Sequence, residues 1–233
     1  ELLEITDTEI KRPENILIKE NVRTLGICSI LSNNGTILFQ ATPDGLSLYN
    51  PSKCSCDYFL NIFALYSSHV VHFVSNSRQI FMFLTSKVIY MCQCQFANGN
   101  SNVEKCPINT NSNVTTMALS KPDSSGLSEY IAYGVFDSPS SSIEIHNVSV
   151  DPAARERIIS EKMPSKVSSI KIMYCTVNGT ETMKIAIGLE EGTIVVGHVD
   201  LIQRVIDKVS TIQFGSGSCI LTPLFNKFDN PIL

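Results

Sequence analysis

Four segments of the chain repeat one pattern, in which an apolar run meets a tight turn and continues as a second apolar run. The segments are 36–49, 79–92, 130–146 and 184–198. Each has the period-2 alternation and the turn residues of a β-hairpin. They begin roughly 45 to 55 residues apart, about the length of one β-propeller blade. The repeat therefore predicts an all-β fold, a β-propeller with WD40-like blades of four antiparallel strands.

The repeat divides the chain into about four blades and the start of a fifth. Residues 209–214 have the pattern of an opening strand for that fifth unit, and residues 215–233 contain no closing hairpin. Because a propeller requires a closed ring, we expect residues 1–233 to be part of a single propeller domain whose remaining blades lie outside this chain. The chain contains no Trp. The blades therefore lack the Trp-Asp ending of ordinary WD40 repeats and are of a divergent type.

Three connecting segments carry signals of their own. Residues 43–45 are Pro-Asp-Gly, the residue types of a tight connection between two strands. Residues 97–112 are rich in Asn and Ser and contain Pro107, so we expect a long surface loop there. Asp151 followed by Pro152 is typical of a helix start and predicts one short helical turn between the third and fourth units.

Charge and hydropathy exclude two classes of partner. The formal net charge is -4, and the 18 Lys and Arg residues form no cluster of the kind that neutralises phosphates. We therefore expect no direct binding of nucleic acid by this segment. No apolar run reaches the ~18–20 residues of a membrane span, so we expect no membrane partner.

Cysteines and glycosylation signals leave two cellular compartments open. The chain has Asn-x-Ser/Thr sequons at Asn34, Asn113, Asn147 and Asn178. Its eight cysteines are Cys28, Cys54, Cys56, Cys92, Cys94, Cys106, Cys175 and Cys219. A secreted protein uses such residues for glycans and disulfides. However, Asn-Gly pairs also serve turns, and a strand Cys packs as a small apolar side chain. We favour a reduced, intracellular protein and keep a secreted one as the alternative.

The cysteine and histidine spacings do not predict a metal site. The pairs Cys54/Cys56 and Cys92/Cys94 would each place two thiols on one face of a strand. Structural zinc sites more often use two matched Cys-x₂₋₄-Cys pairs, which are absent. The four histidines lie in strand-like runs without ligand spacing; they are His69, His72, His146 and His198. We predict no metal and no cofactor.

None of the common catalytic patterns is present. Residues 215–219, Gly-Ser-Gly-Ser-Cys, have the wrong spacing for a nucleophile elbow. Four acidic residues lie at expected hairpin turns, where turn chemistry explains them; they are Asp44, Asp137, Glu190 and Glu191. His146 and His198 hold matching positions in what we expect to be the last strands of two repeats, which favours a structural role. The sequence therefore predicts no catalytic residue, and a chain that is not an enzyme.

The third and fourth units resemble a known family. The matching segments are 114–137, which includes a Gly-Leu-Ser loop at 126–128, then 143–146, 167–172 and 184–194. The strand pair at 36–48 is also similar, with Leu-Ser-Leu after its glycine. These segments resemble the damaged-DNA-binding protein 1 family. That family also holds the 160-kDa subunit of the cleavage-and-polyadenylation specificity factor and the 130-kDa subunit of splicing factor 3b. The register is similar to the second of three propellers in such proteins.

The resemblance implies a protein–protein interaction scaffold. In the damaged-DNA-binding branch, the second propeller docks the cullin of a ubiquitin ligase, which implies an adaptor of a cullin-4-type ligase that is nuclear, or nuclear and cytoplasmic. In the RNA-processing branches the same architecture is a scaffold for polyadenylation or splicing subunits, which is the alternative. An extracellular, glycosylated, ligand-binding propeller is the second alternative. No partner-binding residue is identified by the resemblance.

Overall fold

A computed structural model describes residues 4–5, 10–11, 23–32, 35–50, 55–76, 78–97, 100–110, 112–148, 155–177, 180–218, 221, 224–225 and 231–232. Strands account for most of this part of the chain, and a single short helix, α1 (Ile62–Tyr66), interrupts them there. No helix within the described ranges is long and apolar enough to cross a membrane.

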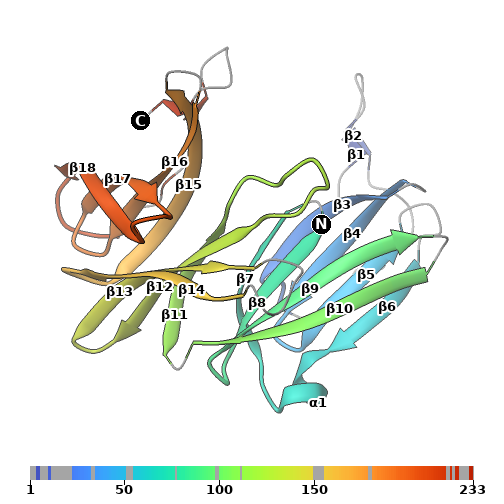
Figure 1. Ribbon diagram of the computed structural model, residues 1–233. Helices are drawn as coiled ribbons and strands as arrows, with labels where there is room; N and C mark the ends of the chain where they lie inside the picture. Colours follow the sequence, from blue (N-terminus) through green and yellow to red (C-terminus); the bar gives the residue numbers. More distant parts are fainter. Residues whose placement is uncertain are drawn as a thin grey trace.

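Four antiparallel sheets of four strands follow one another along the chain (Figure 1). We call them blades 1 to 4. Blade 1 contains β3 (Gly26–Ser32), β4 (Gly35–Thr42), β5 (Gly45–Asn50) and β6 (Ser55–Asn61). Blade 2 contains β7 (Val70–Ser75), β8 (Gln79–Leu84), β9 (Val88–Ala97) and β10 (Asn100–Asn109). Blade 3 contains β11 (Asn113–Leu119), β12 (Tyr130–Asp137), β13 (Ser140–Asn147) and β14 (Arg157–Met163). Blade 4 contains β15 (Val167–Val177), β16 (Thr180–Leu189), β17 (Thr193–Asp200) and β18 (Val205–Gln213).

Two short strand pairs lie outside the blades. They are β1 (Glu4–Ile5) with β2 (Ile10–Lys11), and β19 (Leu224–Phe225) with β20 (Pro231–Ile232). β20 contacts β15 of blade 4.

The four predicted hairpins are the middle two strands of the four blades. They are β4–β5, β8–β9, β12–β13 and β16–β17. In the first hairpin, Pro43 and Asp44 form the turn and Gly45 follows it. A Cβ on Gly45 would lie 1.8 Å from the Leu60 carbonyl oxygen, so only glycine fits where β5 approaches β6. The predicted turn chemistry is confirmed here.

The hydrophobic core consists of layers between neighbouring blades. On β8, Ile80, Met82 and Leu84 pack in the layer shared with blade 1. Phe81 and Phe83, which alternate with them, pack in the layer shared with blade 3. All six residues of β8 are buried. Five of these six residues are apolar, as expected of a strand that is buried on both faces, which explains why the repeated hairpins have the strongest apolar signal in the sequence.

The first strands of blades 2, 3 and 4 lie side by side, because β11 contacts both β7 and β15. All three have a β-bulge near the strand start, where the register with the second strand shifts by one residue. The extra residues are Val71, Thr115 and Ser168. The Thr115 hydroxyl donates to the Val167 carbonyl at 2.6 Å, so the bulge of blade 3 also joins blade 4. Blades that repeat the same bulge at the same position are copies of one structural unit. The β-propeller prediction is confirmed.

The segment expected to be a long loop is mostly strand. β9 continues to Ala97, and residues 100–109 form β10. Pro107 misled the prediction, because proline is excluded from central strands and tolerated on edge strands. β10 is an edge strand of its sheet. Its Asn- and Ser-rich composition is that of an outer strand.

Blades 3 and 4 also extend further than the sequence indicated. Residues 157–163 form β14, which closes blade 3, while the predicted helical turn at 151–154 lies outside the described residues. Residues 209–213 belong to β18 and close blade 4, so their assignment to a fifth unit was wrong. An exposed outer strand can carry apolar residues too: Val209 is 60% exposed and Ile212 42% exposed. The expectation that further blades lie outside this chain stays a prediction.

The tight contact between blades 3 and 4 gives the first testable prediction. A Cβ on Gly134 of β12 would lie 2.7 Å from Thr115 Oγ1 and 2.7 Å from Val167 Cβ. Gly134→Ala should therefore lower the free energy of unfolding by about 1–3 kcal/mol, as overpacked cores do. Thermal unfolding should show a Tm lower by roughly 2–4 °C for each kcal/mol. The exposed Ser160→Ala on β14 is the control, with a change within about 0.5 kcal/mol. Equal Tm values for the two variants would contradict the packing described.

Candidate functional site

Two adjoining cavities are lined by residues of blades 2, 3 and 4, at the end of the blades that carries the β11–β12 loop. The first, about 540 Å³, lies beneath the β11–β12 loop, residues 120–129. The second, about 770 Å³, runs along β7, β11 and β15. The two cavities have five lining residues in common: Ser120, Lys121, Pro122, Tyr174 and Glu181. We call the two cavities together the axial hollow. Their volumes lie within the roughly 300–1,000 Å³ of small-molecule sites.

The loop over the hollow is held by its own polar groups. Asp123 Oδ1 accepts hydrogen bonds from the backbone N–H of Ser125 at 2.8 Å and of Leu127 at 3.0 Å. The Ser125 hydroxyl donates to the same oxygen at 2.6 Å. These bonds, the Ser125 hydroxyl first, hold the pKa of Asp123 below its usual range. The carboxylate of Asp123 is therefore part of the loop's framework.

Blade 2 anchors the same loop through a buried amide. Gln79 Oε1 accepts from the Ser128 N–H at 2.6 Å, and Gln79 Nε2 donates to the Ser128 carbonyl at 3.3 Å. Asn76 Nδ2 donates to the Ser128 hydroxyl at 2.8 Å, and that hydroxyl donates to the Ser120 carbonyl at 2.6 Å. Gln79 is 1% exposed and Ser128 2% exposed. Unpaired buried groups of this kind cost about 1–3 kcal/mol each, so the network fixes the loop in place. Sequence reasoning assigned Gln79 only to the start of a hairpin.

Ionisable side chains and two tyrosines surround the first cavity. Lys121 Nζ lies 3.0 Å from Glu181 Oε1, which joins the blade 3 loop to β16 of blade 4. The Tyr130 hydroxyl donates to Glu129 Oε1 at 2.8 Å. Burial, followed by Glu129, raises the pKa of Tyr130, and burial also raises the pKa of Tyr174. Both phenols therefore remain neutral hydrogen-bond donors at physiological pH.

The residues that the sequence marked at hairpin turns lie elsewhere. The β4–β5, β12–β13 and β16–β17 turns are at the ends of the blades opposite to the β11–β12 loop. Asp44 Oδ1 lies 3.4 Å from Nδ1 of His69, and Glu190 is 2.8 Å from Lys166. The hydroxyl of Ser112 donates to Asp137. The other acidic and histidine residues singled out in the sequence do not join these pairs into one site. Glu191 follows Glu190 in its turn, His72 stacks on Phe83, and His198 lies on β17.

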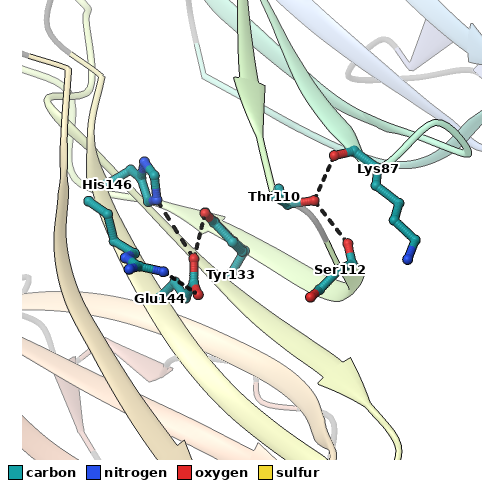
Figure 2. A network of polar contacts seen from close by, with 7 residues as sticks. Lys87, Thr110, Ser112, Tyr133, Glu144 and His146 are labelled. Atoms are coloured by element: carbon teal, nitrogen blue, oxygen red, sulfur yellow. Dashed lines mark hydrogen bonds and ion pairs between the residues drawn. The ribbon is translucent and has the colours of Figure 1, made fainter.

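A second polar cluster surrounds a buried carboxylate on blade 3 (Figure 2). Glu144 is 8% exposed and accepts a hydrogen bond from the Tyr133 hydroxyl at 2.9 Å. Arg157 Nη1 lies 3.3 Å from Glu144 Oε1, and His146 Nε2 lies 3.7 Å from Glu144 Oε2. The cluster joins β12, β13 and β14.

His146 and His198 are on the third strands of their blades, so their assignment to last strands was wrong.

The surroundings of Glu144 make it a structural group. Burial alone would raise its pKa. The neighbouring His146, the hydrogen bond from the Tyr133 hydroxyl and the positive charge of Arg157 outweigh burial and hold the pKa of Glu144 below its usual value. A general base works best with a pKa near the working pH and with a free lone pair. Glu144 is instead a carboxylate that is ionised at neutral pH, and both of its oxygens already have partners.

Few of the cysteines and sequons fall on described side chains. Cys92 is buried between blades 1 and 2, and Cys175 is half-buried on β15 with Sγ 3.8 Å from the Thr182 carbonyl. The side chains of the other six cysteines, and the sequons at Asn34 and Asn178, lie outside the described residues. Asn113 begins β11 and Asn147 ends β13. Among the residues that the structure describes, no three His, Cys, Asp or Glu side chains form a group that could hold a metal ion.

Comparisons with known proteins show the fold. No family model and no curated protein sequence matches the chain. Among solved structures, Sqt1 of Saccharomyces cerevisiae is similar with a TM-score of 0.61 at 12% identity, over 84% of this chain and 48% of that one. BBS1N in complex with ARL6DN is similar with a TM-score of 0.53 at 12% identity, over 92% of this chain and 60% of that one. This chain therefore spans about half to three fifths of their lengths.

A third similar structure corrects one expectation. The periplasmic gluconolactonase PpgL of Pseudomonas aeruginosa is similar with a TM-score of 0.58 at 11% identity, over 93% of this chain and 64% of that one. The same fold therefore also occurs in a hydrolytic enzyme. The prediction that the chain is not an enzyme was wrong, because it took the absence of common catalytic patterns as evidence against catalysis, whereas this fold also occurs in a hydrolytic enzyme.

The buried carboxylate gives a prediction about acid stability. Because the pKa of Glu144 is lower in the folded than in the unfolded chain, its stabilising effect is complete above the unfolded value of about 4.3 and is lost as the pH falls through the folded pKa. Glu144→Gln should reduce the free energy of unfolding at pH 7 by about 1.5–3 kcal/mol and weaken the loss of stability between pH 5 and pH 3. Denaturant unfolding across this pH range measures both effects.

The matched control for Glu144→Gln is Glu190→Gln. Glu190 pairs with Lys166 at the surface, where an ion pair contributes about 1 kcal/mol or less. An acid sensitivity in Glu144→Gln equal to that of the unmodified protein would contradict the structural role of Glu144.

Proposed function

We propose that the chain is a propeller that binds protein partners at the end of the blades that carries the 120–129 loop. The observation that carries this proposal is the fixed presentation of that loop. Its backbone is bonded to Gln79 of the neighbouring blade and to its own Asp123. Loops held by a rigid scaffold are the usual site of recognition, because little ordering is required when the partner binds.

A similar solved structure supports a role in protein binding. BBS1N was crystallised in complex with ARL6DN, so a protein with this fold is known with a protein partner. The charged and aromatic side chains around the hollow of this chain are of the types that form interface contacts.

For the identity of the partner, we propose the cullin of a cullin-4-type ubiquitin ligase. The support is the sequence resemblance of segments 114–137 and 184–194 to the damaged-DNA-binding protein 1 family. Nuclear localisation follows from the same resemblance and remains a prediction. A pre-mRNA processing complex is the alternative, and an extracellular glycosylated propeller is the second alternative.

Titration with a cullin-4-type N-terminal domain tests this assignment. Binding of the full-length protein, measured by interferometry, is the expected result. Co-purification with polyadenylation or splicing subunits in place of cullin would instead support the RNA-processing alternative. A mass loss on glycosidase treatment would support the extracellular one.

A matched pair of surface substitutions locates the binding end. Ser124 is exposed on the 120–129 loop, and Ser140 is exposed at the opposite end of blade 3. Ser124→Trp should weaken partner binding by at least about tenfold because the indole blocks the approach to the loop, whereas Ser140→Trp should leave it unchanged. The reverse pattern would place the partner at the opposite end and contradict the proposal.

Hydrolysis of small lactones is a second candidate function. It is favoured by the size of the axial hollow and by the shared fold of the Pseudomonas aeruginosa gluconolactonase. Proton release from glucono-1,5-lactone, compared with the spontaneous rate, measures it. A rate above background that falls in Glu181→Gln would support this function. A rate equal to background would exclude this substrate.

A further inference from the structure

The chemistry of the first cavity points to the charge of its ligand. Among the described residues that line it, three have carboxylates and Lys121 has the one positive charge. Asp123 accepts three hydrogen bonds from its own loop, whereas Glu129 accepts one from Tyr130 and Glu181 has one exposed partner, Lys121. Glu129 and Glu181 are therefore the carboxylates that a ligand can engage. Both lie close enough to Tyr174 to raise the pKa of its phenol. Tyr174 lines the same cavity as both carboxylates.

We propose that this cavity binds a cationic side chain, arginine or lysine, of a protein partner; this inference rests on the proposed protein-binding function. An ammonium or guanidinium group entering beside Tyr174 would meet carboxylates from two blades, Glu129 from blade 3 and Glu181 from blade 4. Charge-assisted hydrogen bonds to carboxylates are about twice as strong as neutral ones. Tyrosine rings add a favourable surface for a cation.

Lys121 occupies the position that the ligand would take. It lies 3.0 Å from Glu181, and the side chains are 63% and 54% exposed. An ion pair this exposed is weak, because water and salt screen it. An incoming cation can therefore replace Lys121 at Glu181 with little loss. This gives Lys121 the role of an internal competitor.

The same geometry argues against an anionic ligand. Lys121 is already neutralised by Glu181, and an added anion would face the carboxylate of Glu129 as well. The phenol of Tyr130 donates to Glu129 and is not free to donate to an anion. Removal of the Lys121 charge should therefore strengthen the binding of a cationic ligand and weaken the binding of an anionic one.

Two short peptides of equal shape test the inference. The probes are N-acetyl-Gly-Arg-Gly-amide and the same peptide with citrulline, which lacks the positive charge. Chemical-shift titration of the whole protein should show binding of the arginine peptide and at least roughly tenfold weaker binding of the citrulline peptide. Glu181→Gln and Glu129→Gln should each weaken arginine binding by roughly tenfold.

Lys121→Gln is the discriminating variant. It should strengthen arginine binding by about two- to fivefold, because the competitor for Glu181 is removed. Glu190→Gln, which breaks the comparable exposed pair with Lys166 at the opposite end, is the control and should change nothing. Loss of binding in Lys121→Gln, equal binding of the two peptides, or no shift with the arginine peptide would overturn the inference.

The outcome separates this inference from the proposed function. Arginine binding without any protein partner would support the cation site and contradict the proposed function. A protein partner whose binding is unchanged in both Glu181→Gln and Glu129→Gln would support the proposed function and overturn the cation site.

Discussion

Packing of one sheet against the next is the constraint on which the rest of the structure depends. The second strands of blades 2 and 3 each lie between two neighbouring blades; β8, for example, has Ile80 and Met82 on the face toward blade 1 and Phe81 on the face toward blade 3. A single blade would leave both of these faces in water. Burying one large apolar side chain contributes about 1.5–3 kcal/mol, so the stability of each blade comes largely from its neighbours.

The same packing creates the candidate site. Because β7, β11 and β15 lie side by side, residues far apart in sequence reach one hollow. Gln79 holds the backbone of Ser128 across 49 positions of sequence, and Lys121 reaches Glu181 across 60. The bond to Ser128 is buried and fixes the loop, whereas the ion pair to Glu181 is exposed and replaceable. A recognition site requires both features: a loop held in place by buried hydrogen bonds, and an exposed contact that a partner can replace.

The sequence predicted the middle of each blade and missed the outer strands. The hairpins were detectable because burial on both faces selects mostly apolar residues. The outer strands β10 and β18 tolerate Pro107 and an exposed Val209, so composition did not distinguish them from loops or from a new unit. The axial hollow had no local signal at all, because three blades contribute to it. The sequence indicated a loop at these positions, including its Gly-Leu-Ser part, but gave no sign that Gln79, the first residue of a hairpin, anchors it.

Hydrogen–deuterium exchange of the protein with and without a bound partner tests the central claim most directly. Backbone amides exchange more slowly where a partner covers them. Slower exchange in residues 120–129 and around Glu181 is the expected result, with no change in the β4–β5 and β12–β13 turns at the opposite end. Slower exchange at those turns, with residues 120–129 unchanged, would contradict a recognition site at the axial hollow.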